Sequence, residues 1–150
     1  MMEMDHIDAE ILRQLRRDGR ISNLALADSV GLSASATLRR VQALEKAGVI
    51  AGYRAVLDPD AMGKGFVALV AVGLSDHSKA SQDAFEQAMT RAQQVTECHN
   101  VSGTIEYIIR VEVADLAAYK YFHTEILGTQ NHVNEITTYI VMGSPKDDRA

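Results

Sequence analysis

In the first fifty residues, apolar positions recur every three or four places, which is the spacing of amphipathic helices. Asp5 is placed to cap a first helix, Ser22 or Asn23 a second, and Ser33 a third. The turn at Gly31 joins the last two helices, and the whole pattern predicts a three-helix unit with a helix-turn-helix. The residues expected to face inward are Ile7, Ile11, Leu12, Leu15, Leu24, Ala27, Val30, Leu38, Val41 and Leu44.

After residue 65 the pattern changes to strands that alternate with helices. The stretch Phe66–Leu74 is almost wholly apolar, and Ile105–Val113 alternates between apolar and polar positions. The other expected elements are helices at 81–92 and from Asp115 onward, and strands at 95–101 and 133–142. Strand–helix–strand occurs twice in this order, which predicts a ferredoxin-like βαββαβ domain and an α+β chain.

The two prolines lie where these patterns break. Pro59 lies in the stretch 58–65, which has no sustained apolar period, and Pro145 lies in a polar tail. The sequence therefore predicts a helix-turn-helix domain over 1–57 ending in a short strand at 49–57. A linker over 58–65, a second domain over 66–143 and a tail over 144–150 follow.

Two strands of the second domain are apolar at consecutive positions and so on both faces. They are Phe66–Val72 and Tyr139–Met142. Helices on one side of a four-stranded sheet cover only one face, so something else must cover the other. A second copy of the domain, packed by two-fold symmetry, is the expected cover; the linker or the first domain is the alternative.

Composition and charge limit the class of protein. The chain is 47% hydrophobic and 23% charged and has a single cysteine, Cys98, which is typical of a cytoplasmic protein without disulfides. No apolar run is long enough to span a membrane. The net charge of −5 argues against nucleic acid as a partner, but the stretch Ser33–Leu44 contains Arg39 and Arg40 and no acidic residue. A helix that reads a groove needs only such a local positive face.

A series of short motifs now resembles the leucine-responsive/asparagine-responsive (Lrp/AsnC, feast/famine) family of regulators over Met4–Gly143. In the first domain they are DAEIL at 8–12, DGRIS at 18–22, VGLS at 30–33, Arg40-Val41 with Leu44-Glu45, and GVIAGY at 48–53. In the second they are ECH at 97–99, VSG at 101–103, Glu106-Tyr107 and TYIVM at 138–142. The resemblance implies a transcription regulator that binds double-stranded DNA, responds to an amino acid, and forms dimers that often assemble into octamers.

The chain departs from the family pattern in two places. Ala34 follows the cap serine of the third helix, where the family commonly has proline; alanine is an excellent helix former, so the helix is expected to persist. The family's Gly-Asp-aromatic-Asp-Tyr hairpin reads Gly103-Thr-Ile-Glu-Tyr107 here. This change indicates altered effector choice, weaker effector binding, or none.

The third helix carries most of the candidate DNA contacts, because N-terminal residues of a recognition helix point at base edges. They are Ser33, Ser35, Ala36, Thr37, Arg39 and Arg40, and Ser22 and Asn23 are candidates for phosphate contact at the start of the second helix. There are competing interpretations. Arg39 and Arg40 could simply be solvent-exposed helix positions, or Arg40 could pair with an acidic residue. Helix capping would equally explain Ser22 and Asn23.

By resemblance, the effector site lies around the 102–107 hairpin, where dimers meet. Gly103 would let a ligand approach the backbone, Thr104 would supply a hydroxyl, and Glu106 would accept a hydrogen bond from an α-ammonium group. The expected apolar walls are Val101, Leu116 and Val133. An ordinary hairpin with an exposed carboxylate is the alternative.

The sequence predicts no catalytic site, metal site or cofactor. Cys98-His99 has no second cysteine or histidine at ligand spacing, and no phosphate loop or paired-carboxylate site is present. Two alternatives to a ligand-gated regulator remain. One is an architectural DNA-compacting protein without an effector. The other is an enzyme similar to the siroheme decarboxylases, which the acidic second domain disfavours, since its only arginines are Arg91, Arg110 and Arg149.

Overall fold

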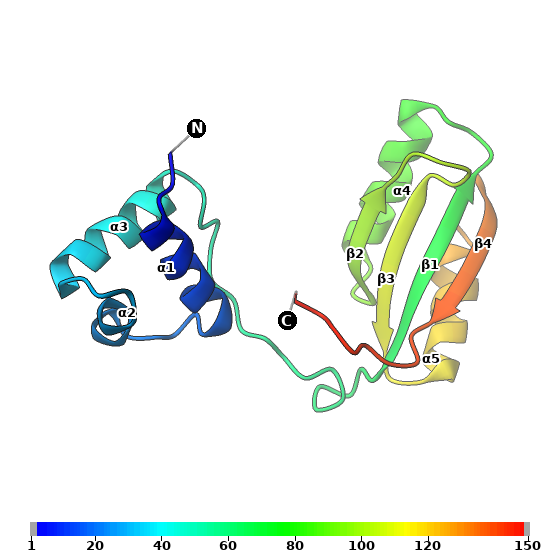
Figure 1. The fold of residues 1–150 in the computed structure, drawn as a ribbon. Helices are drawn as coiled ribbons and strands as arrows, with labels where there is room; N and C mark the ends of the chain where they lie inside the picture. Colours follow the sequence, from blue (N-terminus) through cyan, green and yellow to red (C-terminus); the bar gives the residue numbers. More distant parts are fainter. Residues whose placement is uncertain (1–2, 149–150) are drawn as a thin grey trace. The chain divides into compact units, whose positions relative to one another are not determined.

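A computed structural model describes residues 3–148. The chain forms two compact units, and the boundary between them in the sequence lies between Val56 and Leu57 (Figure 1). The first unit contains α1 (His6–Arg17), α2 (Asn23–Val30) and α3 (Ala34–Lys46). Asp5, Ser22 and Ser33 cap these helices, each accepting a backbone N–H with its side chain as the sequence predicts. The three helices pack around the buried side chains of Ile11, Leu26 and Leu44.

Two leucines expected in this core lie at the surface. Leu24 is 73% exposed, and Leu26, which is 2% exposed, takes the inward position on α2. The two residues lie roughly 200° apart around the helix axis, so only one of them can face the core. α2 begins Asn-Leu-Ala-Leu-Ala, and this sequence does not show whether Leu24 or Leu26 faces the core. On α3, Leu38 is exposed and Thr37 is buried in the same way.

The segment 49–57 is not a strand, contrary to the prediction. The backbone N–H groups of Val49 and Ile50 both donate to the carbonyl of Leu44 and so close the end of α3. Beyond them the segment has no regular secondary structure and is exposed, and none of its residues joins a sheet in the described part of the chain. A strand needs a neighbouring strand for its hydrogen bonds, and residues 3–56 contain no other.

The second unit is an antiparallel sheet with its helices on one face (Figure 1). Its strands are β1 (Phe66–Leu74), β2 (Val95–Asn100), β3 (Tyr107–Val113) and β4 (Val133–Ile140), in the spatial order β2-β3-β1-β4. The helices are α4 (Lys79–Arg91) and α5 (Leu116–Tyr121), the latter continued by a π-helical segment, Phe122–Leu127. This topology confirms the predicted ferredoxin-like fold. β1 has the predicted bounds, and the other three strands each differ from the prediction at one end, by one or two residues.

The side chains of the sheet alternate between a buried and a half-open face. Val70 and Ile109 belong to the buried face, where Phe85, Met89 and Phe122 of the helical layer pack on the strands. The opposite face carries Leu69, Ile108 and Tyr139, which are exposed in the single chain. Leu69 pairs with Arg110 on one side and with Tyr139 on the other, so these apolar side chains form one surface, the open sheet face. No helix between residues 3 and 148 is long and apolar enough to cross a membrane.

The inward position of Leu26 on α2 leads to a stability prediction. We expect Leu26→Ala to lower the free energy of unfolding by about 2–5 kcal/mol, because it leaves a cavity in the small core of the first unit. Leu24→Ala, two residues away in the same helix, should change it by less than about 0.5 kcal/mol. Urea denaturation followed by circular dichroism measures both values. A larger loss for Leu24→Ala than for Leu26→Ala would contradict the observed phase.

Candidate DNA-reading helix and effector-binding hairpin

The start of α3 is fixed by its own backbone and cap. Gly31 adopts a positive φ of 71° at the end of α2, a conformation that favours glycine. The hydroxyl of Ser33 accepts the backbone N–H of Ala36 at 3.2 Å and lies 3.3 Å from the hydroxyl of Ser35. These contacts hold the first turn of α3 in place and leave Ser35 exposed.

Arg39 is the candidate whose side chain is best placed for a partner outside the chain. It is exposed and forms no ion pair with any residue from 3 to 148. Ala36 is half-buried and lies on the flank of the helix that Arg39 shares, beside a shallow hollow of about 380 Å³. Ser35, Ala36 and Arg39 therefore lie together on the accessible side of the helix.

Thr37 does not belong to this accessible side. Its side chain is 0% exposed, and its hydroxyl donates to the backbone carbonyl of Ser33 at 3.0 Å. On the same face, Val41 lies one turn further along and packs against the core, and Leu44 lies two turns further along and belongs to the core. The structure thus corrects its assignment as a DNA contact: Thr37 is a core residue with a satisfied hydroxyl.

Arg40 is held by two carboxylates. Its Nη1 atom lies 2.9 Å from both carboxylate oxygens of Asp5 and 2.8 Å from Oδ1 of Asp8. Asp8 is almost fully buried and also accepts the backbone N–H of Asp5. The backbone N–H of Asp8, together with the Arg40 guanidinium, lowers the pKa of Asp5. Arg40 therefore joins the first turn of α1 to the middle of α3, which is the acid-paired alternative left open by the sequence.

The polar residues at the start of α2 also have structural partners. Ser22 accepts the backbone N–H of Ala25 at 3.1 Å, as a helix cap does. The side-chain amide of Asn23 donates to the carbonyl of Ala34 at 2.8 Å and so ties α2 to α3. The remaining candidates for a phosphate contact here are the free backbone N–H groups of this helix end.

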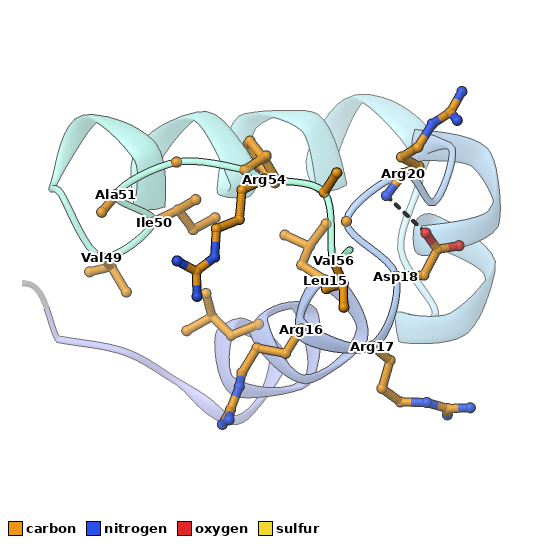
Figure 2. Close-up of a pocket in the computed structure, with 15 residues that line it drawn as sticks. Leu15, Arg16, Arg17, Asp18, Arg20, Val49, Ile50, Ala51, Arg54 and Val56 are labelled. Carbon is orange, nitrogen blue, oxygen red and sulfur yellow. Dashed lines mark hydrogen bonds between the residues drawn. The ribbon is translucent and has the colours of Figure 1, made fainter. Parts of the chain in front are cut away.

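A group of arginines lies beside a cavity of about 620 Å³ in the first unit (Figure 2). Leu15, Ile50 and Val56 form apolar parts of its wall, and Arg54 reaches into it, whereas Arg17 and Arg20 point away from it (Figure 2). None of these arginines is among the residues predicted to contact DNA, although the arginine-rich run at 16–20 ends only two residues before the α2 cap, Ser22.

In the second unit, the 101–106 connection is closed by backbone hydrogen bonds. The N–H of Val101 donates to the carbonyl of Glu106 at 2.8 Å, and the N–H of Glu106 donates to Val72 at 3.1 Å. Gly103 has a φ of 150°, and it and Thr104 are exposed at the tip of the connection. The backbone of the tip is thus open to an approaching group.

The carboxylate of Glu106 already has two partners inside the chain. Its Oε2 atom accepts the backbone N–H of Leu74 at 2.6 Å, and its Oε1 atom lies 3.0 Å from Nδ1 of His77. Glu106 therefore fastens the end of β1 and the following loop to the hairpin. An α-ammonium group would have to share this carboxylate with the imidazole of His77.

The two remaining wall residues lie at opposite ends of the sheet. Val133 pairs with Leu74 and so lies at the same end as the hairpin. Leu116 follows the end of β3, where Val113 pairs with Phe66, the first residue of β1. Because β1 spans about 25 Å, the structure does not bring Leu116 to the hairpin within one chain.

Known proteins share this arrangement. Residues 4–51 match the family profile of winged helix-turn-helix DNA-binding domains, and residues 67–150 match that of the Lrp/AsnC ligand binding domain. The leucine-responsive regulatory proteins of Escherichia coli K12 and Salmonella typhimurium are each 38% identical over 147 residues, which is 96% of this chain and 88% of the relative. The chain belongs to the Lrp/AsnC family.

Solved structures of Lrp/AsnC proteins agree over nearly the whole chain. A Neisseria meningitidis transcriptional regulator in complex with L-Met superposes with a TM-score of 0.92 at 28% identity, covering 97% of this chain and 94% of the other. An AsnC family regulator from Agrobacterium tumefaciens gives 0.89 at 30% identity and covers 96% and 94%. This Lrp/AsnC protein is therefore a DNA-binding transcriptional regulator with a ligand-binding domain.

Outside these regions the described residues contain little reactive chemistry for an Lrp/AsnC regulator to use. Burial raises the pKa of the Cys98 thiol to about 11, so it is protonated at neutral pH and is a poor nucleophile or ligand. Nε2 of His99 lies 3.1 Å from a carboxylate oxygen of Glu97. No group of three or more metal-ligating side chains occurs in residues 3–148.

The Glu106 contact predicts a local change in backbone protection. Glu106→Ala removes the acceptor of the Leu74 N–H, so we expect this amide to exchange with solvent about tenfold faster or more. Glu106→Gln retains an acceptor oxygen and should preserve most of the protection. Amide hydrogen exchange followed by NMR measures the effect, and Glu112→Ala, on the open sheet face, is the matched control. Unchanged Leu74 exchange in Glu106→Ala would show that the carboxylate does not hold this strand end.

Proposed function

We propose that this regulator reads DNA sequence with the accessible side of α3, binds an amino acid at the hairpin end of its sheet, and acts as a dimer or larger assembly. DNA reading by α3 is supported by one observation: some of its polar side chains are bonded inside the unit, and others are exposed to solvent. Arg40 and Thr37 are engaged inside the unit, whereas Arg39 and Ser35 are exposed on a helix whose start is firmly capped. An exposed arginine on such a helix can donate two hydrogen bonds to a guanine.

Phosphate contacts are proposed around the same helix. Ser33 and Ala36 lie at the start of α3, and the backbone N–H groups near Ser22 and Asn23 lie at the start of α2; both helix ends favour an anion. Arg16 and Arg20, which are exposed, add positive charge before the α2 cap. We assign these groups to phosphate positioning and Arg39 with Ser35 to base contact.

We place the effector site at Val101, Gly103, Thr104, Glu106 and Val133. The open backbone at Gly103, the exposed Thr104 hydroxyl and the Glu106 carboxylate supply groups that complement an amino acid's carboxylate and ammonium ends. The L-Met complex of the Neisseria meningitidis relative supports an amino acid as the class of effector. Leu116 can contribute to this site only from a second copy of the chain, because the Leu116 of the same chain lies at the opposite end of the sheet from the hairpin.

We propose that the open sheet face is covered by a second copy of the chain. Leu69, Ile108 and Tyr139 expose apolar surface in the middle of a sheet whose other face is fully packed. Burying this surface in a two-fold dimer removes it from water and brings two reading helices into one particle. Assembly of such dimers into octamers is the larger state that we propose from the family resemblance.

The proposed division of labour along the chain keeps the sequence-based boundaries. Residues 1–57 bind DNA, 58–65 link, 66–143 bind the effector and associate, and 144–150 form a tail whose last two residues lie outside the described part. We propose that the protein works in the cytoplasm, where its DNA is, and that it is not an enzyme, in keeping with the regulatory proteins to which it is similar.

A second candidate function is an architectural DNA-binding protein without an effector. The engagement of Glu106 by Leu74 and His77 favours it, since this carboxylate is already occupied within the chain. Such a protein would bind DNA with strong salt dependence and little sequence preference.

The two adjacent arginines of α3 give a direct test of the reading surface. We expect Arg39→Ala to lower affinity for the preferred DNA site by about 10- to 100-fold while thermal stability stays unchanged. Arg40→Met should instead lower the melting temperature, because it leaves the buried carboxylate of Asp8 without its cation. Fluorescence anisotropy with labelled DNA and thermal unfolding measure the two effects. Arg13→Ala, which removes an exposed positive charge from α1, is the matched control and should do neither. Full affinity in Arg39→Ala would contradict the assignment.

The open sheet face gives a test of assembly. We expect Leu69→Glu to shift the protein from dimers or larger species to monomers at micromolar concentration, because it would bury a charge at the centre of the interface. Sedimentation equilibrium measures the mass, and Tyr121→Glu, an exposed position on α5, is the control. Wild-type protein that sediments as a monomer at all concentrations would rule out the proposed cover.

A further inference from the structure

Leu38 is an exposed apolar side chain on the second turn of α3. It is 45% exposed and is absent from the group of side chains that pack around Ile11, Leu26 and Leu44. Its apolar neighbours on the helix, Val41 and Leu44, pack inward instead. The core of the unit therefore does not account for a leucine at this position.

The position of Leu38 continues the proposed reading surface. It lies three residues after Ser35, four before Gln42 and next to Arg39, and all four side chains are exposed. At roughly 100° per residue, Leu38, Gln42, Ser35 and Arg39 follow one another across a single side of the helix. An apolar side chain thus lies within a row of hydrogen-bonding ones.

The edges of base pairs in the major groove offer one apolar group, the 5-methyl group of thymine. The polar side chains of the row can bond to the nitrogen and oxygen atoms of base edges, but Leu38 cannot. Only a thymine methyl gives its exposed surface a partner within the same groove. Burial of one methyl group against it is worth a factor of about four in affinity.

We propose that Leu38 packs against the 5-methyl group of a thymine, so that this regulator recognises an A·T pair by apolar contact beside the hydrogen bonds of Arg39 and Gln42. The inference rests on the proposed function, since it requires α3 to lie in the major groove. It adds a base-specific contact that is made without a polar group, and it names the chemical group that is read. The rival occupant of this surface is a second copy of the chain.

The experiment uses the full-length protein and a DNA site selected by it from a random duplex library. Each thymine of the site is replaced in turn by uracil, which keeps Watson–Crick pairing and removes only the methyl group. Affinities are measured for the wild type, Leu38→Ala and Leu38→Gln, the last of which keeps the length and helix propensity of the side chain. Met62→Ala, at an exposed apolar position in the 58–65 linker, is the control, and sedimentation reports the assembly state of every variant.

We expect one thymine per half-site at which uracil weakens wild-type binding by about three- to fivefold. Leu38→Ala and Leu38→Gln should bind the thymine site more weakly and lose the difference between thymine and uracil there, while Met62→Ala behaves as the wild type. If both Leu38 variants keep the full uracil effect, another side chain reads the methyl group and the proposal is wrong. It is also wrong if uracil has no effect at any position, or if the Leu38 variants change only the assembly state. Failure of the library to yield any preferred site would overturn the proposed function itself, which distinguishes that outcome from the loss of the Leu38 contact alone.

Discussion

The ion-paired cluster of Arg40 with Asp5 and Asp8 holds α3, the helix that we propose reads DNA, against the start of α1. A unit of fewer than sixty residues has little core with which to orient three helices, and here that core centres on Ile11, Leu26 and Leu44. Arg40 adds a link between the start of α1 and the middle of α3, where a buried carboxylate and a helix cap both converge on one guanidinium. With Arg40 engaged in this way, its neighbour Arg39 is the arginine left at the surface.

The second unit depends on the burial of apolar surface rather than on ion pairs. Its sheet is packed on one face by α4 and α5, and the other face exposes apolar side chains that hydrogen bonds and caps cannot compensate. A single copy therefore leaves the apolar side chains of the open sheet face in contact with water, which is the basis for proposing a dimer. The hairpin end of the same sheet is tightly bonded, since Glu106 joins it to the end of β1. An effector that competes for Glu106 would act directly on the strand at the centre of the sheet, which offers a path from ligand to assembly.

The sequence predicted the fold well because periodicity records which face of an element is buried. The ferredoxin-like strand order, the three capped helices and β1 itself all follow from such patterns. It placed Leu24 and Leu38 in the core because an apolar residue at helical spacing looks the same whether it meets a core or a partner outside the chain. It also placed Thr37 and Arg40 among the DNA contacts, because residue type does not show that a hydroxyl is bonded to Ser33 or that a guanidinium meets two acids distant in sequence. Composition alone predicts a strand over 49–57, but residues 3–56 contain no partner strand for it.

We propose above all that this protein selects DNA by sequence and that an amino acid changes this selection. The most direct measurement is the affinity for a labelled fragment from upstream of its own gene, compared with an unrelated fragment of equal length and at equal salt. Both are titrated with and without a mixture of the twenty amino acids. We expect tighter binding to the upstream fragment and a shift of that binding when the mixture is added. Equal affinity for both fragments would contradict sequence selection at its own gene. Selective binding that the mixture leaves unchanged would contradict amino-acid sensing at the Glu106 hairpin.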